Sequence, residues 1–84
     1  MTAPVTIYML RGCRHCIRAK RLLRRKGAAY DEIPTLARRS ARRAELTERF
    51  GRRTFPQIVI GDRHVGGMAD LAALERSGEL DRLL

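Results

Sequence analysis

Residues 5–10, which read Val-Thr-Ile-Tyr-Met-Leu, form a mostly apolar run of residues that favour β structure, and this run predicts a β strand. Over residues 14–26 the spacing of apolar positions changes to that of a helix, with arginines along the opposite side. Gly27 is well placed to end this helix, because glycine readily adopts the left-handed conformation after a last helical turn. The apolar side of the helix consists of Cys16, Ala19, Leu22 and Leu23.

The rest of the chain predicts further short elements separated by glycine and proline. They are a strand over 28–33 ended by Pro34, a helix over 36–50, a strand over 57–60, a Gly61-Asp62 turn, a strand over 63–65, a helix over 68–77 ended by Gly78, and a last helical turn containing Leu80, Leu83 and Leu84. The order β-α-β-α-β-β-α predicts a parallel, right-handed first βαβ unit and an antiparallel hairpin. We therefore expect one α/β domain over residues 1–84, with a four-stranded mixed sheet flanked by three main helices.

Composition narrows the class of protein. The chain has 84 residues, and no apolar run approaches the ~20 residues of a membrane-spanning helix, so we expect no membrane partner. It carries 18 basic and 9 acidic residues, for a net charge of +9. The charge is uneven: residues 11–26 sum to +8 and residues 38–53 to +5, whereas residues 27–37 and 54–84 each sum to −2.

Three interpretations of the two basic segments remain open. They are solvated faces of two helices, a rim that attracts an anionic small substrate, or a nucleic-acid surface. The nucleic-acid interpretation lacks interleaved aromatic residues and a recognisable recognition helix, so no nucleic-acid partner is expected.

The candidate chemistry lies in Cys13-Arg14-His15-Cys16, between the first strand and the first helix. Because the N-terminus shows no secretory signal, we expect a cytoplasmic protein, in which such a pair serves redox chemistry or metal binding. At a helix N-terminus, Cys13 would favour the thiolate and attack disulfides, and Cys16, one turn later, would resolve the intermediate.

Two other interpretations of the cysteine pair fit the sequence less well. A zinc site would need two more ligands from His15 and His64, with His15 wedged inside the pair, so no metal is expected. Two unreactive core cysteines would make the strand-to-helix placement a coincidence. A redox pair is the best account.

Two more segments carry candidate chemistry. Pro56 in Thr54-Phe55-Pro56 directly precedes a core strand, where proline is disfavoured unless it begins the strand or follows a cis bond. Gly66-Gly67 opens a helix whose free N–H groups suit an anion, and Asp70 could pair with an amine or cap that helix.

In this order and spacing, these motifs resemble glutaredoxin over nearly the whole chain. The resemblance is strongest to short bacterial dithiol glutaredoxins, with Cys-Arg-His-Cys in place of Cys-Pro-Tyr-Cys. It rests on Cys13-x-x-Cys16, Arg18–Gly27, Thr54-Phe-Pro-Gln-Ile58, His64-Val-Gly-Gly67 and Asp70-Leu71. The resemblance implies a thioredoxin fold, a cis Phe55–Pro56 bond, and glutathione-dependent reduction of protein disulfides and glutathione mixed disulfides by Cys13 and Cys16.

The resemblance also implies a binding groove for glutathione as co-substrate. The Phe55 backbone would pair with the cysteinyl part, and Asp70 would face the γ-glutamyl amine. The residues implied are Arg14, His15, Arg43, Thr54, Phe55, Pro56, Gly67, Met68, Ala69 and Asp70. Since the usual Pro-Tyr pair and a lysine before the motif are missing, we expect Arg11, Arg14 and His15 to stabilise the Cys13 thiolate.

Alternative functions remain. They are a hydrogen donor to ribonucleotide reductase recycled by thioredoxin reductase, a carrier of an iron–sulfur cluster bridged by Cys13 of two protomers, and a basic nucleic-acid-binding module. The leading expectation is a monomeric enzyme whose partners are glutathione and proteins that carry disulfides or bound glutathione.

Overall fold

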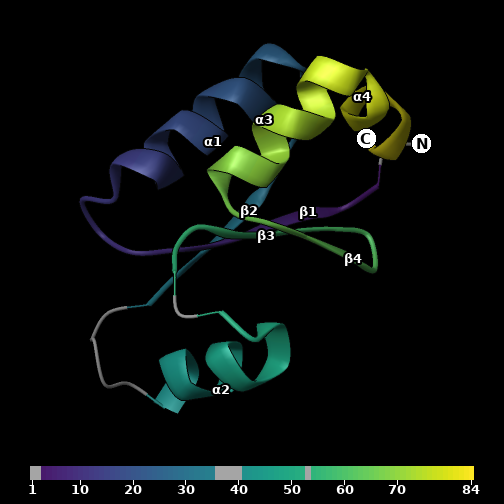
Figure 1. Cartoon of the computed structure of the whole chain (residues 1–84). Coiled ribbons are helices and arrows are strands. Elements are labelled where there is room, and N and C mark those ends of the chain that lie inside the picture. Colours follow the sequence, from purple (N-terminus) through teal and green to yellow (C-terminus); the bar gives the residue numbers. More distant parts are fainter. Residues whose placement is uncertain (1–2, 36–40, 53) are drawn as a thin grey trace.

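The computed structural model describes residues 3–35, 41–52 and 54–84, and in residues 41–43 it describes the backbone alone. Its elements in chain order are β1 (Val5–Met9), α1 (Arg14–Arg25), β2 (Asp31–Pro34), α2 (Ala41–Phe50), β3 (Gln57–Ile60), β4 (Arg63–Gly66), α3 (Met68–Ser77) and α4 (Glu79–Leu83) (Figure 1). The predicted order of elements is confirmed, and the expected last helical turn is α4.

The strands form one mixed sheet in the order β2-β1-β3-β4. β1 pairs in parallel with β2 and antiparallel with β3, so that Ile7 lies between Glu32 and Ile58. β3 and β4 form the predicted antiparallel hairpin, with an irregularity between Ile58 and Val59. The parallel βαβ unit and the hairpin are therefore both confirmed.

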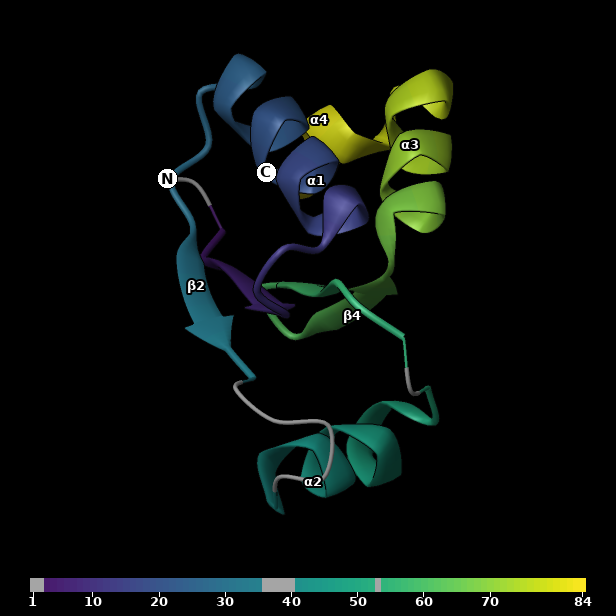
Figure 2. The same cartoon turned by 90° about the vertical axis from the view of Figure 1, so that its left-hand side faces the viewer.

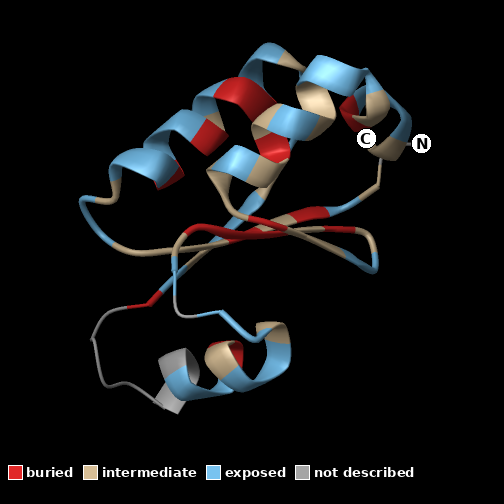
Figure 3. Cartoon of the chain, in the orientation of Figure 1, coloured by how far each residue is buried: buried red, intermediate tan, exposed pale blue. Residues whose placement is uncertain are grey.

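Helices cover the two faces of the sheet unequally. α1, α3 and α4 lie on one face and α2 lies on the other (Figure 2). The core lies between the sheet and α1, α3 and α4 (Figure 3), because alternate strand residues point to that side. It comprises Val5, Ile7, Ala19, Leu22, Leu23, Ala28, Ile58, Ile60, Leu71 and Leu80. The predicted apolar side of α1 is buried throughout, with Cys16, Ala19 and Leu23 at 0 % exposure.

On the opposite face, aromatic contacts attach α2 to the sheet. The Phe50 ring at the end of α2 stacks on the His64 ring of β4 at 4.2 Å and packs at 5.7 Å against Tyr8 of β1. Arg49 also donates a hydrogen bond to the Tyr8 hydroxyl at 3.3 Å. Leu46 is buried on this helix, and the side chain of Ala41 lies outside the described residues.

Element boundaries differ from prediction by more than one residue at two places. β2 begins at Asp31 and includes Pro34, whereas the sequence pattern predicted a strand over 28–33. The reason is that the Ala28 N–H donates to the Leu23 carbonyl at 3.0 Å and so completes the end of α1 instead of joining the sheet. The predicted helix over 36–50 is helical from Ala41, and residues 36–40 lie outside the described part. Within the described residues, no helix is long and apolar enough to cross a bilayer.

Candidate active site

Cys13 occupies the N-cap of α1, which is the position expected from the sequence. Its sulfur accepts a hydrogen bond from the Cys16 N–H at 3.3 Å, and the thiol donates to the Phe55 carbonyl at 3.7 Å. The side chain is partly exposed, so a disulfide substrate can reach it. A sulfur in this position is held by the positive end of the helix, which stabilises negative charge on an attacking thiolate.

Cys16 lies one helical turn further on and is fully buried, and both cysteines are reduced. Burial, with a smaller contribution from the hydrogen bond to Cys13, raises the pKa of the Cys16 thiol from 9.0 to about 12. Cys16 therefore keeps its proton at neutral pH. A partly exposed sulfur at the helix end with a covered thiol behind it suits the attacking and resolving roles, which stay a prediction.

The raised pKa of Cys16 predicts a pH-dependent stability. In the unfolded chain this thiol ionises near its ordinary pKa of 9.0, whereas the folded state holds the proton up to about 12. The stabilising contribution is therefore complete below about pH 9 and is lost as the pH rises toward 12, by at most about 1.4 kcal/mol per pH unit. Urea unfolding of the reduced protein at pH 8 and at about pH 10.5 should show this decline, and Cys16→Ala should show a smaller one. Equal declines in the two proteins would contradict the prediction.

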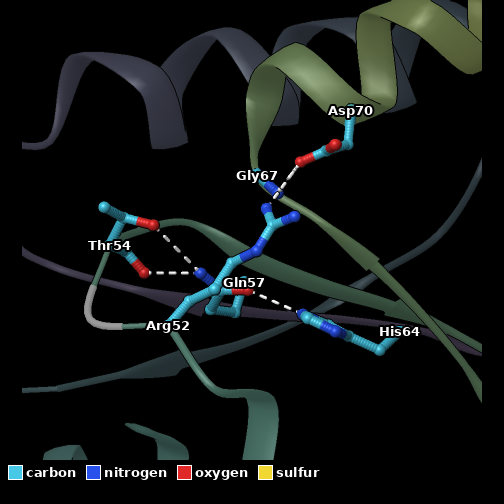
Figure 4. A network of polar contacts seen from close by, with 6 residues as sticks. All are labelled: Arg52, Thr54, Gln57, His64, Gly67 and Asp70. Carbon is cyan, nitrogen blue, oxygen red and sulfur yellow. Dashed lines mark hydrogen bonds and ion pairs between the residues drawn. The ribbon is translucent and has the colours of Figure 1, made fainter.

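The segment from Thr54 to Pro56 faces the cysteines, and the Phe55–Pro56 bond is cis, as expected. Behind it lies Gln57, which is 1 % exposed. The Gln57 Nε2 donates to the Thr54 carbonyl at 2.7 Å and to the Thr54 hydroxyl at 3.3 Å (Figure 4). Since Nε2 faces these oxygens, the Gln57 Oε1 faces His64 Nε2 at 2.7 Å and accepts a hydrogen bond from it. This chain of bonds fixes the Thr54 loop to the sheet.

The surroundings of His64 favour its neutral form. Burial, with a further contribution from the Arg52 guanidinium, lowers its pKa below 6.5. The neutral ring still donates through Nε2, and its face stacks on Phe50. His64 is therefore a structural link between α2, β4 and the Thr54 loop.

The start of α3 forms the third side of the site. The Asp70 carboxylate oxygen Oδ2 accepts a hydrogen bond from the Gly67 N–H at 3.0 Å, and it forms an ion pair with Arg52 at 2.8 Å (Figure 4). The bond from Arg52, followed by the bond from Gly67, lowers the pKa of Asp70 below 3.8. The capping role considered for Asp70 is thus observed. A Cβ on Gly67 would lie 3.5 Å from the Pro56 carbonyl, so this helix start adjoins the cis-proline loop.

Gly66 is required by both its backbone and its surroundings. Its φ is +116°, and a Cβ there would lie 2.5 Å from the Asp70 Oδ2 and 2.8 Å from the Arg52 Nη1. We expect Gly66→Ala to destabilise the protein by about 2 kcal/mol or more and to separate the ion pair. The pKa of Asp70 should then rise toward its ordinary value, which carboxyl NMR titration would detect.

Gly27→Ala is the matched control for this substitution. Gly27 also has a positive φ, of +71°, but a Cβ there would meet nothing within 4 Å. Gly27→Ala should lower the free energy of unfolding by about 1 kcal/mol, from backbone strain alone, and should leave the Asp70 pKa unchanged. If the two variants unfold at the same urea concentration and the Asp70 pKa is unchanged in both, the crowding argument is wrong.

The structure brings together most of the residues singled out from the sequence. Cys13, the loop of Thr54, Phe55 and Pro56, and the helix start of Gly67, Met68, Ala69 and Asp70 lie around one end of α1. Arg11, Arg14 and His15 are exposed, and no contact among the described residues joins them to the Cys13 sulfur. The Arg43 side chain lies outside the described residues.

Three residues of the site were not assigned a role from the sequence. Gln57 and His64 hold the Thr54 loop, and Arg52 holds Asp70. A signal existed for Gln57, since a polar residue at an inward position of a core strand needs buried partners. Arg52 and Asp70 are 18 residues apart, and no local pattern connects them.

Comparison with known families decides the assignment. The model of the family described as Glutaredoxin matches residues 5–65. The chain belongs to the glutaredoxin family. Glutaredoxins are thiol–disulfide oxidoreductases with the thioredoxin fold, so the resemblance drawn from the sequence motifs and the α/β fold expected from them are confirmed.

Individual glutaredoxins are similar over nearly the whole chain. A glutaredoxin of Pseudomonas aeruginosa is 53 % identical over 81 residues, which cover 96 % of this chain and 95 % of that protein. The solution structure of glutaredoxin from Brucella melitensis superposes with a TM-score of 0.84 at 55 % identity, covering 99 % of this chain and 89 % of that one. A crystal structure of a buckwheat glutaredoxin–glutathione complex superposes with a TM-score of 0.87 at 29 % identity, covering 98 % and 76 %.

Proposed function

We propose that this glutaredoxin reduces protein disulfides and glutathione mixed disulfides through Cys13 and Cys16, with glutathione as the reductant. The observation that supports this most directly is the meeting of three segments. The sulfur of Cys13 lies 3.7 Å from the Phe55 carbonyl, and the start of α3 at Gly67 adjoins Pro56. A tripeptide joined to Cys13 by a disulfide would therefore have backbone groups and a helix N-terminus beside it. The buckwheat relative, whose complex with glutathione is known, supports the same ligand.

In the first proposed route, Cys13 alone reacts. Its thiolate attacks the glutathione sulfur of a mixed disulfide, a Cys13–glutathione disulfide forms, and the protein thiolate leaves and takes up a proton. A second glutathione thiolate attacks the glutathione sulfur bound to Cys13. This step releases glutathione disulfide and restores the Cys13 thiolate. Each turnover therefore oxidises one free glutathione, and the other half of the glutathione disulfide comes from the substrate.

In the second proposed route, Cys13 attacks a protein disulfide and becomes bonded to one of its sulfurs, while the other leaves as a thiolate. Cys16 then loses its proton and attacks the Cys13 sulfur, which releases the substrate as a dithiol and leaves a Cys13–Cys16 disulfide. Two glutathione molecules reduce that disulfide. The raised pKa of Cys16 suits this order, because a thiol that stays protonated does not compete for the first attack.

Glutathione would be held mainly by backbone groups. The Phe55 backbone would pair with its cysteinyl part, beside Thr54 and Pro56. The N–H groups of Met68 and Ala69, at the start of α3, would bind the γ-glutamyl carboxylate.

Charged groups would hold the two ends of the tripeptide. Asp70 would accept from the γ-glutamyl amine, and both of its observed bonds use Oδ2. Arg43 would approach the glycine carboxylate. Arg14 and His15 at the start of α1 would border the tripeptide and, with Arg11, stabilise the Cys13 thiolate.

We place this activity in the cytoplasm, where thiols are kept reduced. The proposed protein partners carry disulfides or bound glutathione, and ribonucleotide reductase is one candidate. A coupled assay tests the reductant: turnover of a glutathionylated peptide is followed with glutathione and glutathione reductase, and separately with thioredoxin reductase. Turnover with the glutathione system is expected. Turnover with thioredoxin reductase alone would overturn the proposal and favour the alternative donor.

A further inference from the structure

A groove of about 520 Å³ lies between α1 and α3, beside the candidate active site. The side chains that line it are Arg18, Arg21, Arg24, Arg25 and Met68. Every charged residue in this lining is therefore an arginine on one helix. Such a surface suits an anionic occupant.

The groove arginines receive almost no compensation from the protein itself. All nine acidic residues belong to the described part of the chain, and the ion pairs among the described residues join them to Lys20, Lys26, Arg52 and Arg63. Of the groove arginines, Arg24 lies 5.9 Å from the centre of the Tyr30 ring. Among the described residues, the other three contact no carboxylate.

The spacing of these arginines along α1 makes them repel one another. Arg18 and Arg21 are three residues apart, and Arg21 and Arg25 are four apart, which places like charges side by side on one helix face. Like charges at this spacing destabilise a helix. Since the fold gains nothing visible from them, a bound acidic group accounts for them best.

The position of the groove connects it to the chemistry. Met68 is the first residue of α3 and follows Gly67, which adjoins the cis-proline loop. Arg18 is five residues beyond Cys13 on α1, or about 7 Å along the helix axis, and Arg25 is about 10 Å further. An extended peptide advances about 3.3 Å per residue, so these distances correspond to about two and three residues.

We propose that this groove docks an acidic segment of a protein substrate, beginning about two residues from its reactive cysteine and about three residues long. This inference rests on the proposed function, because the segment belongs to a protein whose disulfide Cys13 attacks. α2 does not extend the surface, since it lies on the opposite face of the sheet. The narrow, one-helix arrangement favours a short peptide over a nucleic-acid duplex.

Two glutathionylated peptides test the proposal. One carries three acidic residues on each side of its cysteine, and the other carries the matching amides. We expect Arg18→Gln/Arg21→Gln to lower kcat/KM for the acidic peptide about fivefold at low ionic strength, since two exposed charge pairs are lost. Turnover of the amide peptide should not change, and high salt should remove the difference. Arg76→Gln/Arg82→Gln is the control, because it removes the same charge from two exposed arginines outside the groove lining.

Several results would overturn the groove assignment. They are an equal loss in the two double variants, no preference of the parent for the acidic peptide, or tighter retention of a DNA duplex or of phosphatidylserine vesicles than of the acidic peptide at physiological salt. A second measurement separates this inference from the proposed function. Fluorescence anisotropy with the cysteine of the acidic peptide replaced by serine reports docking without redox chemistry. Loss of this binding in Arg18→Gln/Arg21→Gln supports the groove even if glutathione fails to reduce either peptide, whereas turnover without differential binding overturns it.

Discussion

Cys13→Ser should lower the rate of disulfide reduction by at least about a thousandfold, because it removes the nucleophile that both proposed routes require. A serine hydroxyl at the start of α1 can accept the same N–H hydrogen bond as the Cys13 sulfur does, so the fold should be retained. The measurement is turnover of a glutathionylated peptide with glutathione and glutathione reductase. Circular dichroism of the variant would verify that it is folded.

Cys16→Ser is the matched control, since it makes the same replacement of sulfur by oxygen in the other cysteine. It should keep most of the turnover of glutathionylated peptides, which needs Cys13 alone. With a protein disulfide it should accumulate a covalent complex through Cys13, because the resolving thiol is missing, and mass spectrometry would detect this species. Substantial activity in Cys13→Ser, or equal loss in the two variants, would show that the assignment of roles is wrong.

Leu23→Ala should have the largest effect on stability among substitutions on α1. Leu23 is 0 % exposed and packs in the core beneath the helix. Removing a buried leucine side chain to alanine costs about 2–5 kcal/mol, which is a large share of the roughly 4–13 kcal/mol expected for a domain of this length. Urea unfolding of the reduced proteins at neutral pH would measure the loss.

Ile17→Ala on the same helix provides the comparison. Ile17 is 44 % exposed, so its truncation creates no buried cavity and should change the free energy of unfolding by no more than about 0.5 kcal/mol. A loss below about 1 kcal/mol in Leu23→Ala, or similar losses in the two variants, would contradict the core described above.

The elements predicted from the sequence are those whose signal is local. The apolar spacing along α1 identified its buried side, and the glycine after it identified its end. The start of β2 was predicted wrongly. Ala28 is apolar, as a strand residue can be, but its N–H forms a hydrogen bond with the end of α1. Apolar character alone does not tell a helix ending from a strand when both are buried.

The same distinction holds for the candidate site. The cysteine pair could be found because its spacing and its place between a strand and a helix are contained in one short segment. The links from Gln57 to Thr54 and His64, and from Arg52 to Asp70, join side chains whose partners are set by the hairpin and by the start of α3. Many polar residues could have met there, and only the folded chain selects these.

The sequence by itself determined the class of fold and the position of the cysteine pair between a strand and a helix, because both follow from patterns within short stretches of the chain. The tertiary structure decided the rest. It brought the Phe55 carbonyl to Cys13 across 42 residues, buried Cys16 so that its pKa rises, and placed α1 and α2 on opposite faces of the sheet. These properties depend on distance in space and on exclusion of water, and neither is a function of spacing along the chain.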